Sequence, residues 1–265
     1  MTASNGEHLL AIEQMFHVKH RPPPPRQLPS PQRRTPALRP GTSPRGAAPG
    51  ATVMRVSTFS LVARDPESGD LGIAVASKFL AVGAVVPWLA AGVGAIASQA
   101  WANTDFGHQG LELLRQGCSA TETLGRLLRG DREAAKRQVG VVDAFGEVAH
   151  HTGAECLEYA GAVAGSQYTA QGNLLVGPKV LAAMASAYEA RSDRPLAERL
   201  LAALEAGDAA GGDKRGRQAA ALTVVREGLG APGYNDRLVN LRVDDHEDPV
   251  GELRRLWELH RTLRG

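Results

Sequence analysis

The sequence has little cysteine, little excess of either charge and no long apolar run. Only two of its 265 residues are cysteines. Cys118 and Cys156 are far apart, which fits reduced thiols in a cytoplasmic protein better than a disulfide scaffold and leaves no metal-ligand spacing. Lys and Arg number 30 against 28 Asp and Glu, and the basic excess lies before residue 50. Charge therefore gives little support to nucleic-acid binding.

The apolar residues are also too interrupted for a membrane span. Such a span needs about 20 consecutive apolar residues, whereas Pro87 and several glycines break the apolar stretch at residues 81–100. We interpret that stretch as buried strands. The hydrophobic content of 43% is enough for one sizeable core. The sequence thus predicts a cytoplasmic protein without membrane contacts.

The first fifty residues differ in composition from the rest. Residues 21–50 are dominated by Pro, Arg, Ser and Gly, which predicts disorder. A secretory signal would need a continuous apolar core and a cleavage site before this segment, and the sequence has neither there. One set of codons for residues 15–20 contains TTTCACGTGAAA, a palindrome resembling the bacterial chromosome-partition site; alternatively, these residues are arbitrary. We hypothesise that residues 1–53 are a disordered, mis-assigned extension, that translation starts near Met54, and that residues 54–265 form one domain. Sequencing the native N-terminus would test this.

Periodicity predicts strands and helices in alternating groups. Apolar runs at residues 57–64 and 71–77 surround a turn cluster at 65–69, which is typical of a β-hairpin. Further strands are predicted at 93–99, 138–143, 147–152, 168–175, 219–225 and 238–243, and helices at 107–116, 119–129, 177–190, 196–205 and 250–263. Ser119 and Glu122 form a capping box. Hairpin-length turns favour two antiparallel sheets with helices outside over a parallel sheet.

Several segments resemble a known family. They are TFSLVARDP at residues 58–66, GIAVASKF at 72–79, AVG at 81–83 with Pro87, QGN at 171–173, GGDKRGRQ at 211–218, and DDH at 244–246 with Pro249. In this order they resemble the bacterial family catalogued as domain of unknown function 1028, over about residues 57–260. The resemblance implies a fold like that of the N-terminal-nucleophile (Ntn) hydrolases, a four-layer αββα sandwich of two antiparallel sheets flanked by helices. It supplies no biochemical activity.

The resemblance also implies a candidate nucleophile. In an Ntn hydrolase the side chain of the first mature residue attacks an amide carbonyl, and its own α-amine is the base. Thr58 takes that place by resemblance, but residues 55–57 precede it. Its exposure therefore requires autocleavage or a later start, and a start at Val56 would expose Ser57 as an alternative nucleophile. The other interpretation is that Thr58 and Ser60 are ordinary strand residues.

Two more residues are catalytic candidates by the same resemblance. Lys78 follows a strand of small and apolar residues, so it could approach the nucleophile and bind developing negative charge; alternatively it leaves the sheet for solvent. Asn173 could supply a side-chain amide to an oxyanion hole, or it is a turn residue chosen for its backbone conformation.

Charged residues near the end of the chain suggest a substrate-binding group. Asp213, Arg215 and Arg217 lie close together just before a strand, so they could clamp a carboxylate, although a solvated loop explains them equally well.

We expect no metal or other cofactor. The pair Gly211 and Gly212 lacks the Gly-Lys-Ser/Thr of a phosphate loop. Adjacent His150 and His151 would face opposite sides of a strand, and residues 244–246 are better explained as a loop leading into a helix. Ser98 and Cys118 lack triad context, and we interpret them as structural.

Three functions follow from these observations. The first is an amidohydrolase that acts on a small amide or peptide-like substrate. The second is a protein of the same fold that binds a small ligand without hydrolysing it. The third, a structural or assembly protein, has no repeat or strand-exchange segment in its favour. The Ala- and Leu-rich helices predicted after residue 177 suggest a homodimer.

Overall fold

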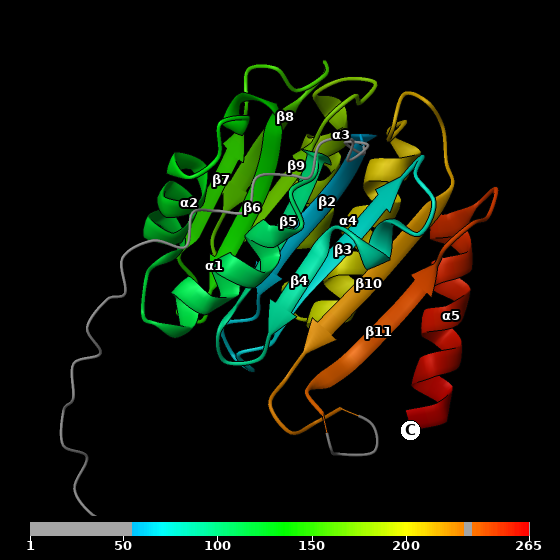
Figure 1. The fold of residues 1–265 in the computed structure, drawn as a ribbon. Helices are drawn as coiled ribbons and strands as arrows, with labels where there is room; N and C mark the ends of the chain where they lie inside the picture. The colour runs from blue at the N-terminus through cyan, green and yellow to red at the C-terminus, as the bar shows by residue number, and fades with distance from the viewer. Residues whose placement is uncertain (1–54, 231–234, 265) are drawn as a thin grey trace, which may run out of the picture. The chain divides into compact units, whose positions relative to one another are not determined.

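A computed structural model describes residues 55–230 and 235–264. The hypothesis about residues 1–53 lies outside these residues. The described part contains two antiparallel sheets, which we call sheet A and sheet B (Figure 1). Two groups of helices cover their outer faces.

Sheet A has β5 (Gly94–Trp101) and β6 (Arg137–Asp143) at its centre, with β7 (Val148–Thr152) beside β6. Both β4 (Pro87–Ala90) and β1 (Arg55–Val56) pair with β5. Helices α1 (Asp105–Arg115) and α2 (Ala120–Arg129) pack on this sheet. A short 3₁₀ turn, η3 (Ala134–Lys136), leads into β6, and another, η2 (Val82–Ala84), precedes β4.

Sheet B has the strand order β11 (Arg237–Val243), β10 (Ala219–Val225), β3 (Leu71–Ser77), β2 (Thr58–Arg64), β9 (Tyr168–Gly172) and β8 (Gly161–Gly165). Helices α3 (Lys179–Glu189), α4 (Leu196–Ala209) and α5 (Pro249–Arg264) cover its outer face. The predicted α+β sandwich of four layers, αββα, is therefore confirmed. None of the helices in the described part of the chain is long and apolar enough to cross a membrane.

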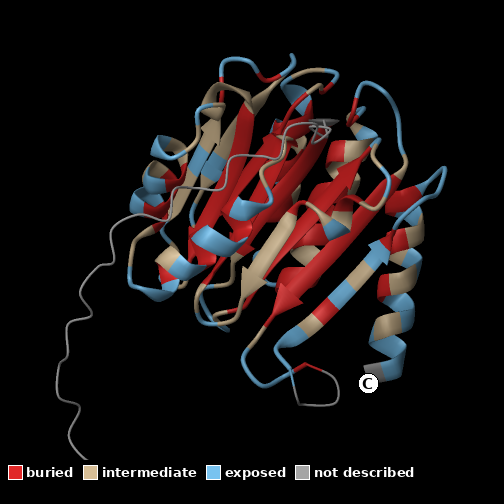
Figure 2. Cartoon of the chain, in the orientation of Figure 1, coloured by how far each residue is buried: buried red, intermediate tan, exposed pale blue. Residues whose placement is uncertain are grey.

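Burial follows this layering. One apolar cluster lies between sheet A and its helices, one between sheet B and its helices, and one between the two sheets. On β2, Leu61 faces the helices and Val62 faces sheet A, so both faces of this central strand are buried. In Figure 2, β3 is buried throughout and β2 is buried up to its last residue, whereas the edge strand β11 mixes exposed, intermediate and buried residues.

The predicted helices and strands are present, with two strands added. The sequence did not predict β1 or β8, and β4 falls within the stretch interpreted as buried strands. β1 has only two residues and β8 consists of glycine, alanine and one valine, so neither shows the alternation that identifies a strand. Of the capping box, one half is present: the Ser119 hydroxyl accepts from the Glu122 N–H at 3.3 Å, while the Glu122 carboxylate pairs with Arg126.

Candidate functional site

The ends of four central strands meet at one end of the sandwich. In sheet B, Thr58 at the start of β2 is opposite Ser77 at the end of β3, and Phe59 is opposite Gly172 at the end of β9. β1 pairs with the last residues of β5. The chain therefore crosses from sheet A to sheet B at Ser57, directly before the candidate nucleophile.

Thr58 is fully buried at this crossing. Its hydroxyl donates to the Val56 carbonyl at 2.9 Å, and its own carbonyl accepts from the Asn173 backbone N–H at 3.0 Å. Its nitrogen belongs to the peptide bond with Ser57, and Ser57 is also buried. A nucleophile with a free α-amine at this position would therefore require that peptide bond to be cleaved.

The carbonyl oxygen of Ser57 accepts two side-chain hydrogen bonds. The Ser77 hydroxyl donates at 2.5 Å, and Arg215 Nη2 donates at 3.0 Å. A hydroxyl and a guanidinium converging on one carbonyl oxygen polarise that carbonyl and stabilise negative charge developing on the oxygen. The arrangement therefore has the donors of an oxyanion hole at the peptide bond preceding Thr58.

Asp213 holds Arg215 in this position. The Arg215 guanidinium donates to both oxygens of the Asp213 carboxylate, at 3.1 Å from Nε and 2.6 Å from Nη2. The backbone N–H groups of Lys78 and Arg215 donate to the same carboxylate at 3.0 and 2.9 Å. The Asp213 side chain is only 1% exposed, against 35% for Arg215, so the carboxylate is a buried anchor and the guanidinium extends toward the surface.

The side chains of the other two charged candidates, Lys78 and Arg217, have partners outside this pair. The Lys78 side chain is exposed, and its ammonium donates to the Arg217 carbonyl at 3.0 Å. The Arg217 guanidinium donates to Asp208 at 2.8 Å, and this hydrogen bond raises the pKa of Arg217. Of the three residues predicted to form a clamp, the structure thus brings Asp213 and Arg215 together, whereas Arg217 has a separate partner.

Asn173 belongs to a buried row of polar side chains between the two sheets. Its side-chain N–H donates to the side-chain oxygen (Oε1) of Gln138 at 2.9 Å. The same oxygen also accepts from the side-chain N–H of Gln99 at 2.9 Å. The Gln99 side-chain oxygen accepts from the Ser60 hydroxyl at 2.7 Å, and that hydroxyl accepts from the Gln171 side-chain N–H at 2.7 Å. All five side chains are almost fully buried. We call this set, Ser60, Gln99, Gln138, Gln171 and Asn173, the amide row.

Sequence reasoning missed the three glutamines. The available signal was a glutamine within each of the predicted strands that became β5, β6 and β9, where its side chain is buried. The amide row also requires Gly140 in β6, because a Cβ there would lie 2.4 Å from the side-chain oxygen of Gln171. The side chain of Asn173 is thus hydrogen-bonded to Gln138, while its backbone N–H donates to the carbonyl of Thr58, the first residue of β2.

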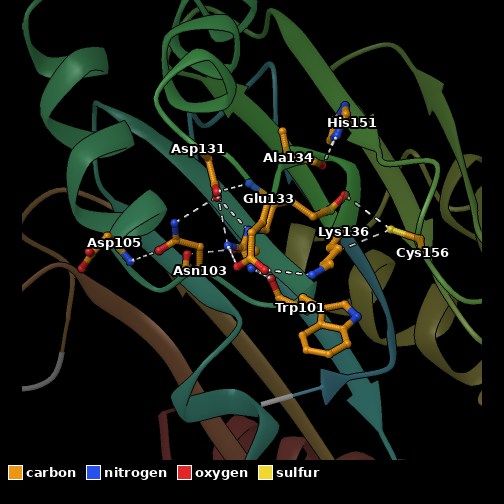
Figure 3. Close-up of polar contacts among 11 residues, drawn as sticks. Trp101, Asn103, Asp105, Asp131, Glu133, Ala134, Lys136, His151 and Cys156 are labelled. Atoms are coloured by element: carbon orange, nitrogen blue, oxygen red, sulfur yellow. Dashed lines mark hydrogen bonds and ion pairs between the residues drawn. The ribbon is translucent and has the colours of Figure 1, made fainter. Parts of the chain in front are cut away.

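A second polar cluster secures the end of β5 (Figure 3). Arg137 donates to Asp131 at 2.7 Å, to Glu133 at 3.0 Å and to the Trp101 carbonyl at 2.7 Å, and Asn103 donates to Asp131 at 3.2 Å. Burial alone would raise the pKa of Asp131, but the hydrogen bonds from Arg137, the Glu133 backbone and Asn103 together lower it. The cluster thereby fixes the segment of β5 on which β1 lies.

The two cysteines take no part in a disulfide. Cys118 is half-buried and Cys156 is buried, and the Cys156 thiol contacts the Arg137 carbonyl at 3.4 Å. Burial raises the pKa of Cys156, so its reactive thiolate form is disfavoured. Ser98, the other residue interpreted as structural, is buried and donates to the Asn103 carbonyl at 3.0 Å.

Within residues 55–230 and 235–264, no group of three or more His, Cys, Asp or Glu side chains is arranged to hold a metal ion. His151 contacts the Ala134 carbonyl at 2.9 Å, whereas His150 is exposed. Asp244 pairs with Arg242. Residues 244–246 lead into α5, as the sequence predicts for a loop before a helix.

Comparison with known proteins identifies the family. Residues 58–253 match the model of the family of unknown function DUF1028. The chain belongs to this family. A crystal structure of a DUF1028 protein from Silicibacter pomeroyi is 34% identical, with a TM-score of 0.69, over 76% of this chain and 88% of that one. No curated protein matches the sequence.

A further solved structure is more distant. Anbu, the ancestral β-subunit from Yersinia bercovieri, is 12% identical, with a TM-score of 0.36, over 77% of this chain and 95% of that one. At that score we draw no conclusion from it about this DUF1028 protein.

Proposed function

We propose that this DUF1028 protein is an Ntn-type amidohydrolase whose nucleophile, Thr58, is released by cleavage of the peptide bond between Ser57 and Thr58. The observation that supports this proposal is the pair of donors on the Ser57 carbonyl oxygen, Ser77 at 2.5 Å and Arg215 at 3.0 Å. That oxygen carries the negative charge when the Thr58 hydroxyl attacks the Ser57 carbonyl carbon.

The cleavage is a transfer of the Ser57 acyl group from nitrogen to oxygen, followed by hydrolysis of an ester. Thr58 Oγ1 bonds to the Ser57 carbonyl carbon, the bond from that carbon to the Thr58 nitrogen breaks, and the hydroxyl proton goes to the departing nitrogen. Water then hydrolyses the resulting ester. The products are a carboxylate on Ser57 and a Thr58 with a free α-amine and a free hydroxyl, which are the base and nucleophile of an Ntn hydrolase.

The same donors would serve a substrate. After cleavage, the acyl carbonyl of an amide substrate takes the place of the Ser57 carbonyl, where Ser77 and Arg215 stabilise its oxyanion. Asp213 is a positioning residue, because it fixes Arg215 through two hydrogen bonds. The place vacated is that of a small, buried serine, which favours substrates with a small acyl group, in keeping with a small amide or peptide-like compound.

Roles for the remaining candidates follow from their contacts. Asn173 holds the carbonyl of Thr58 through its backbone and acts as a positioning residue. The Lys78 ammonium donates a hydrogen bond to the Arg217 carbonyl. A direct role at Thr58 therefore requires the Lys78 side chain to move after the residues before Thr58 have been cleaved off. Ser57 as an alternative nucleophile, cytoplasmic location and a homodimer remain predictions; N-terminal sequencing and the mass of the protein in solution would test the first and the last.

The test is the intact mass of the full chain, purified without a tag and incubated at pH 7. We expect a product beginning at residue 58 for the wild type and for Thr58→Ser, and no such product for Thr58→Ala. Arg215→Gln should slow its formation about 100-fold, the effect of losing one oxyanion donor. Thr223→Ala, which changes another buried strand threonine, is the matched control and should be processed normally. Processed protein should then hydrolyse members of a panel of acyl p-nitroanilides.

One observation favours a second function. In the intact chain the Arg215 guanidinium is engaged by Asp213 and Ser57, and Thr58 is inaccessible to solvent. A chain that keeps the Ser57 peptide bond would bind a small ligand without hydrolysing it. Retention of Ser57 in the wild-type protein after prolonged incubation would refute the hydrolase and leave this alternative.

A further inference from the structure

The last strand of sheet B, β8, has an unpaired edge. It pairs with β9 on one side, and no strand in the described part of the chain pairs with its other side. Natural proteins usually protect such edges with charged residues or proline, because the N–H and C=O groups of an unpaired edge bind other strands. The opposite edge of sheet B is protected in this way, since β11 carries Arg237 and Arg242. By contrast, β8 consists only of Gly, Ala and Val.

The sequence of β8 is the same in both directions. It reads GAVAG from Gly161 to Gly165, so Val163 is its centre. If two copies of β8 lie antiparallel about Val163, glycine is opposite glycine, alanine opposite alanine and valine opposite valine. The resulting contact has the two-fold symmetry that is commonest in soluble oligomers. Val163 packs against the apolar cluster between sheet B and its helices, so pairing with the partner subunit's Val163 extends that cluster.

Exposed aromatic side chains lie at both ends of β8. At its last residue, the turn between β6 and β7 reaches the turn between β8 and β9, since a Cβ on Gly146 would lie 2.5 Å from the side-chain oxygen of Gln167. Phe145, in the first of these turns, is 93% exposed. At the start of β8, Tyr159 is 37% exposed, and a Cβ on Gly161 would lie 3.0 Å from its hydroxyl oxygen. Antiparallel pairing therefore brings Phe145 of each copy to the Tyr159 end of the other.

The charges at these two ends are opposite. Arg64 donates to the side-chain oxygen of Gln167 at 2.7 Å, and no carboxylate among the described residues pairs with it. Glu158, which precedes Tyr159, is exposed and has no ion pair within the described part of the chain. Antiparallel pairing brings the Arg64 end of one copy to the Glu158 end of the other, whereas parallel pairing would bring like charges together. The charges therefore favour the antiparallel arrangement.

We propose that two copies of this chain form a dimer through antiparallel pairing of their β8 strands, which joins the two B sheets across a two-fold axis at Val163. Phe145 of each copy is covered by the Tyr159 end of the other. A contact made by one five-residue strand and the side chains at its ends is at the low end of stable interface sizes, so the dimer dissociates on dilution. The proposal does not depend on whether Thr58 is a nucleophile.

Analytical ultracentrifugation of the full chain over a range of concentrations tests the proposal. We expect a concentration-dependent dimer for the wild type. Phe145→Asp, a change in an exposed turn, should weaken dimerisation at least about tenfold, because it places a charge in an apolar contact. Leu263→Asp changes another highly exposed apolar side chain, at the end of α5, and is the matched control that should dimerise like the wild type. A wild type that is monomeric at every concentration, or unchanged dimerisation of Phe145→Asp, would overturn the proposal.

Cysteine cross-linking tests the symmetry of the pairing. Opposite residues of antiparallel strands have Cα atoms about 4.5–5.5 Å apart, which suits a disulfide. In a Cys118→Ser background, which removes the half-buried native thiol, Val163→Cys should give a disulfide-linked dimer on oxidation. Asn240→Cys, exposed on the edge strand β11, is the matched control and should stay unlinked.

Circular dichroism identifies a cysteine variant that has lost its fold, and the ultracentrifugation of Phe145→Asp then decides. A dimer in which folded Val163→Cys fails to cross-link, or in which Asn240→Cys cross-links equally well, would show that another surface joins the two copies and would exclude the pairing of β8 strands.

Discussion

Replacing Gln138 by Leu should destabilise the protein by about 3 kcal/mol, because Gln138 is the centre of the amide row. The substitution leaves the Asn173 side-chain N–H without its acceptor. It also removes a donor from the buried carbonyl of Gly172 and from the half-buried carbonyl of Gly161. Each unsatisfied buried group costs about 1–3 kcal/mol. Burying a leucine side chain offsets about 1.5–3 kcal/mol of that cost.

Urea unfolding followed by circular dichroism measures this loss from the midpoint at constant slope. Gln218→Leu is the matched control: this glutamine has one exposed hydrogen bond, to Asp245, so its replacement should change the free energy of unfolding by less than about 0.5 kcal/mol.

A double-mutant cycle makes the test sharper. Adding Asn173→Leu removes the donor that Gln138→Leu leaves unsatisfied, so the double variant should be at least about 1 kcal/mol more stable than the sum of the single losses predicts. A loss below about 1 kcal/mol for Gln138→Leu, or simple additivity in the cycle, would refute the view that the amide row stabilises through mutual satisfaction of buried amides.

Three further changes have expected outcomes. Asp131→Asn should cost about 2 kcal/mol at pH 7 in urea unfolding. Because the folded-state pKa of Asp131 is lowered, the difference in free energy of unfolding between the wild type and Asp131→Asn is present above about pH 4 and should shrink as the pH falls through the folded pKa. A constant difference in free energy down to about pH 2 would contradict this. Gly140→Ala should lower the free energy of unfolding by about 1–3 kcal/mol by displacing Gln171. An unchanged melting temperature would show that the Gln171 side chain can move without loss of stability. Ser119→Ala should cost about 1 kcal/mol by uncapping α2, which thermal unfolding would detect as a lower midpoint.

The limits of sequence reasoning are visible at the candidate site. Proximity in sequence suggested that Asp213, Arg215 and Arg217 act together, but a loop directs successive side chains to different partners. Arg217 consequently pairs with Asp208 of α4, nine residues before it. The partner of Arg215, the Ser57 carbonyl, is 158 residues away in the chain and carries no signal in its residue type. Such a pairing depends on which strands become neighbours.

The sequence by itself determined the layering and all of the helices and strands except β1 and β8, apart from the bounds of β4. Alternating and helical periodicities, with hairpin-length turns, specify which faces must be buried, and burial of those faces leads to two sheets between helices. Only the tertiary structure decided what lies between the sheets near Thr58. The amide row joins residues from β2, β5, β6, β9 and the position directly after β9, and whether a buried glutamine is satisfied depends on the register of these four strands. Hydrophobic burial is nearly non-directional and can be inferred from pattern. Hydrogen bonds depend on distances and angles that the chain acquires only when it is folded.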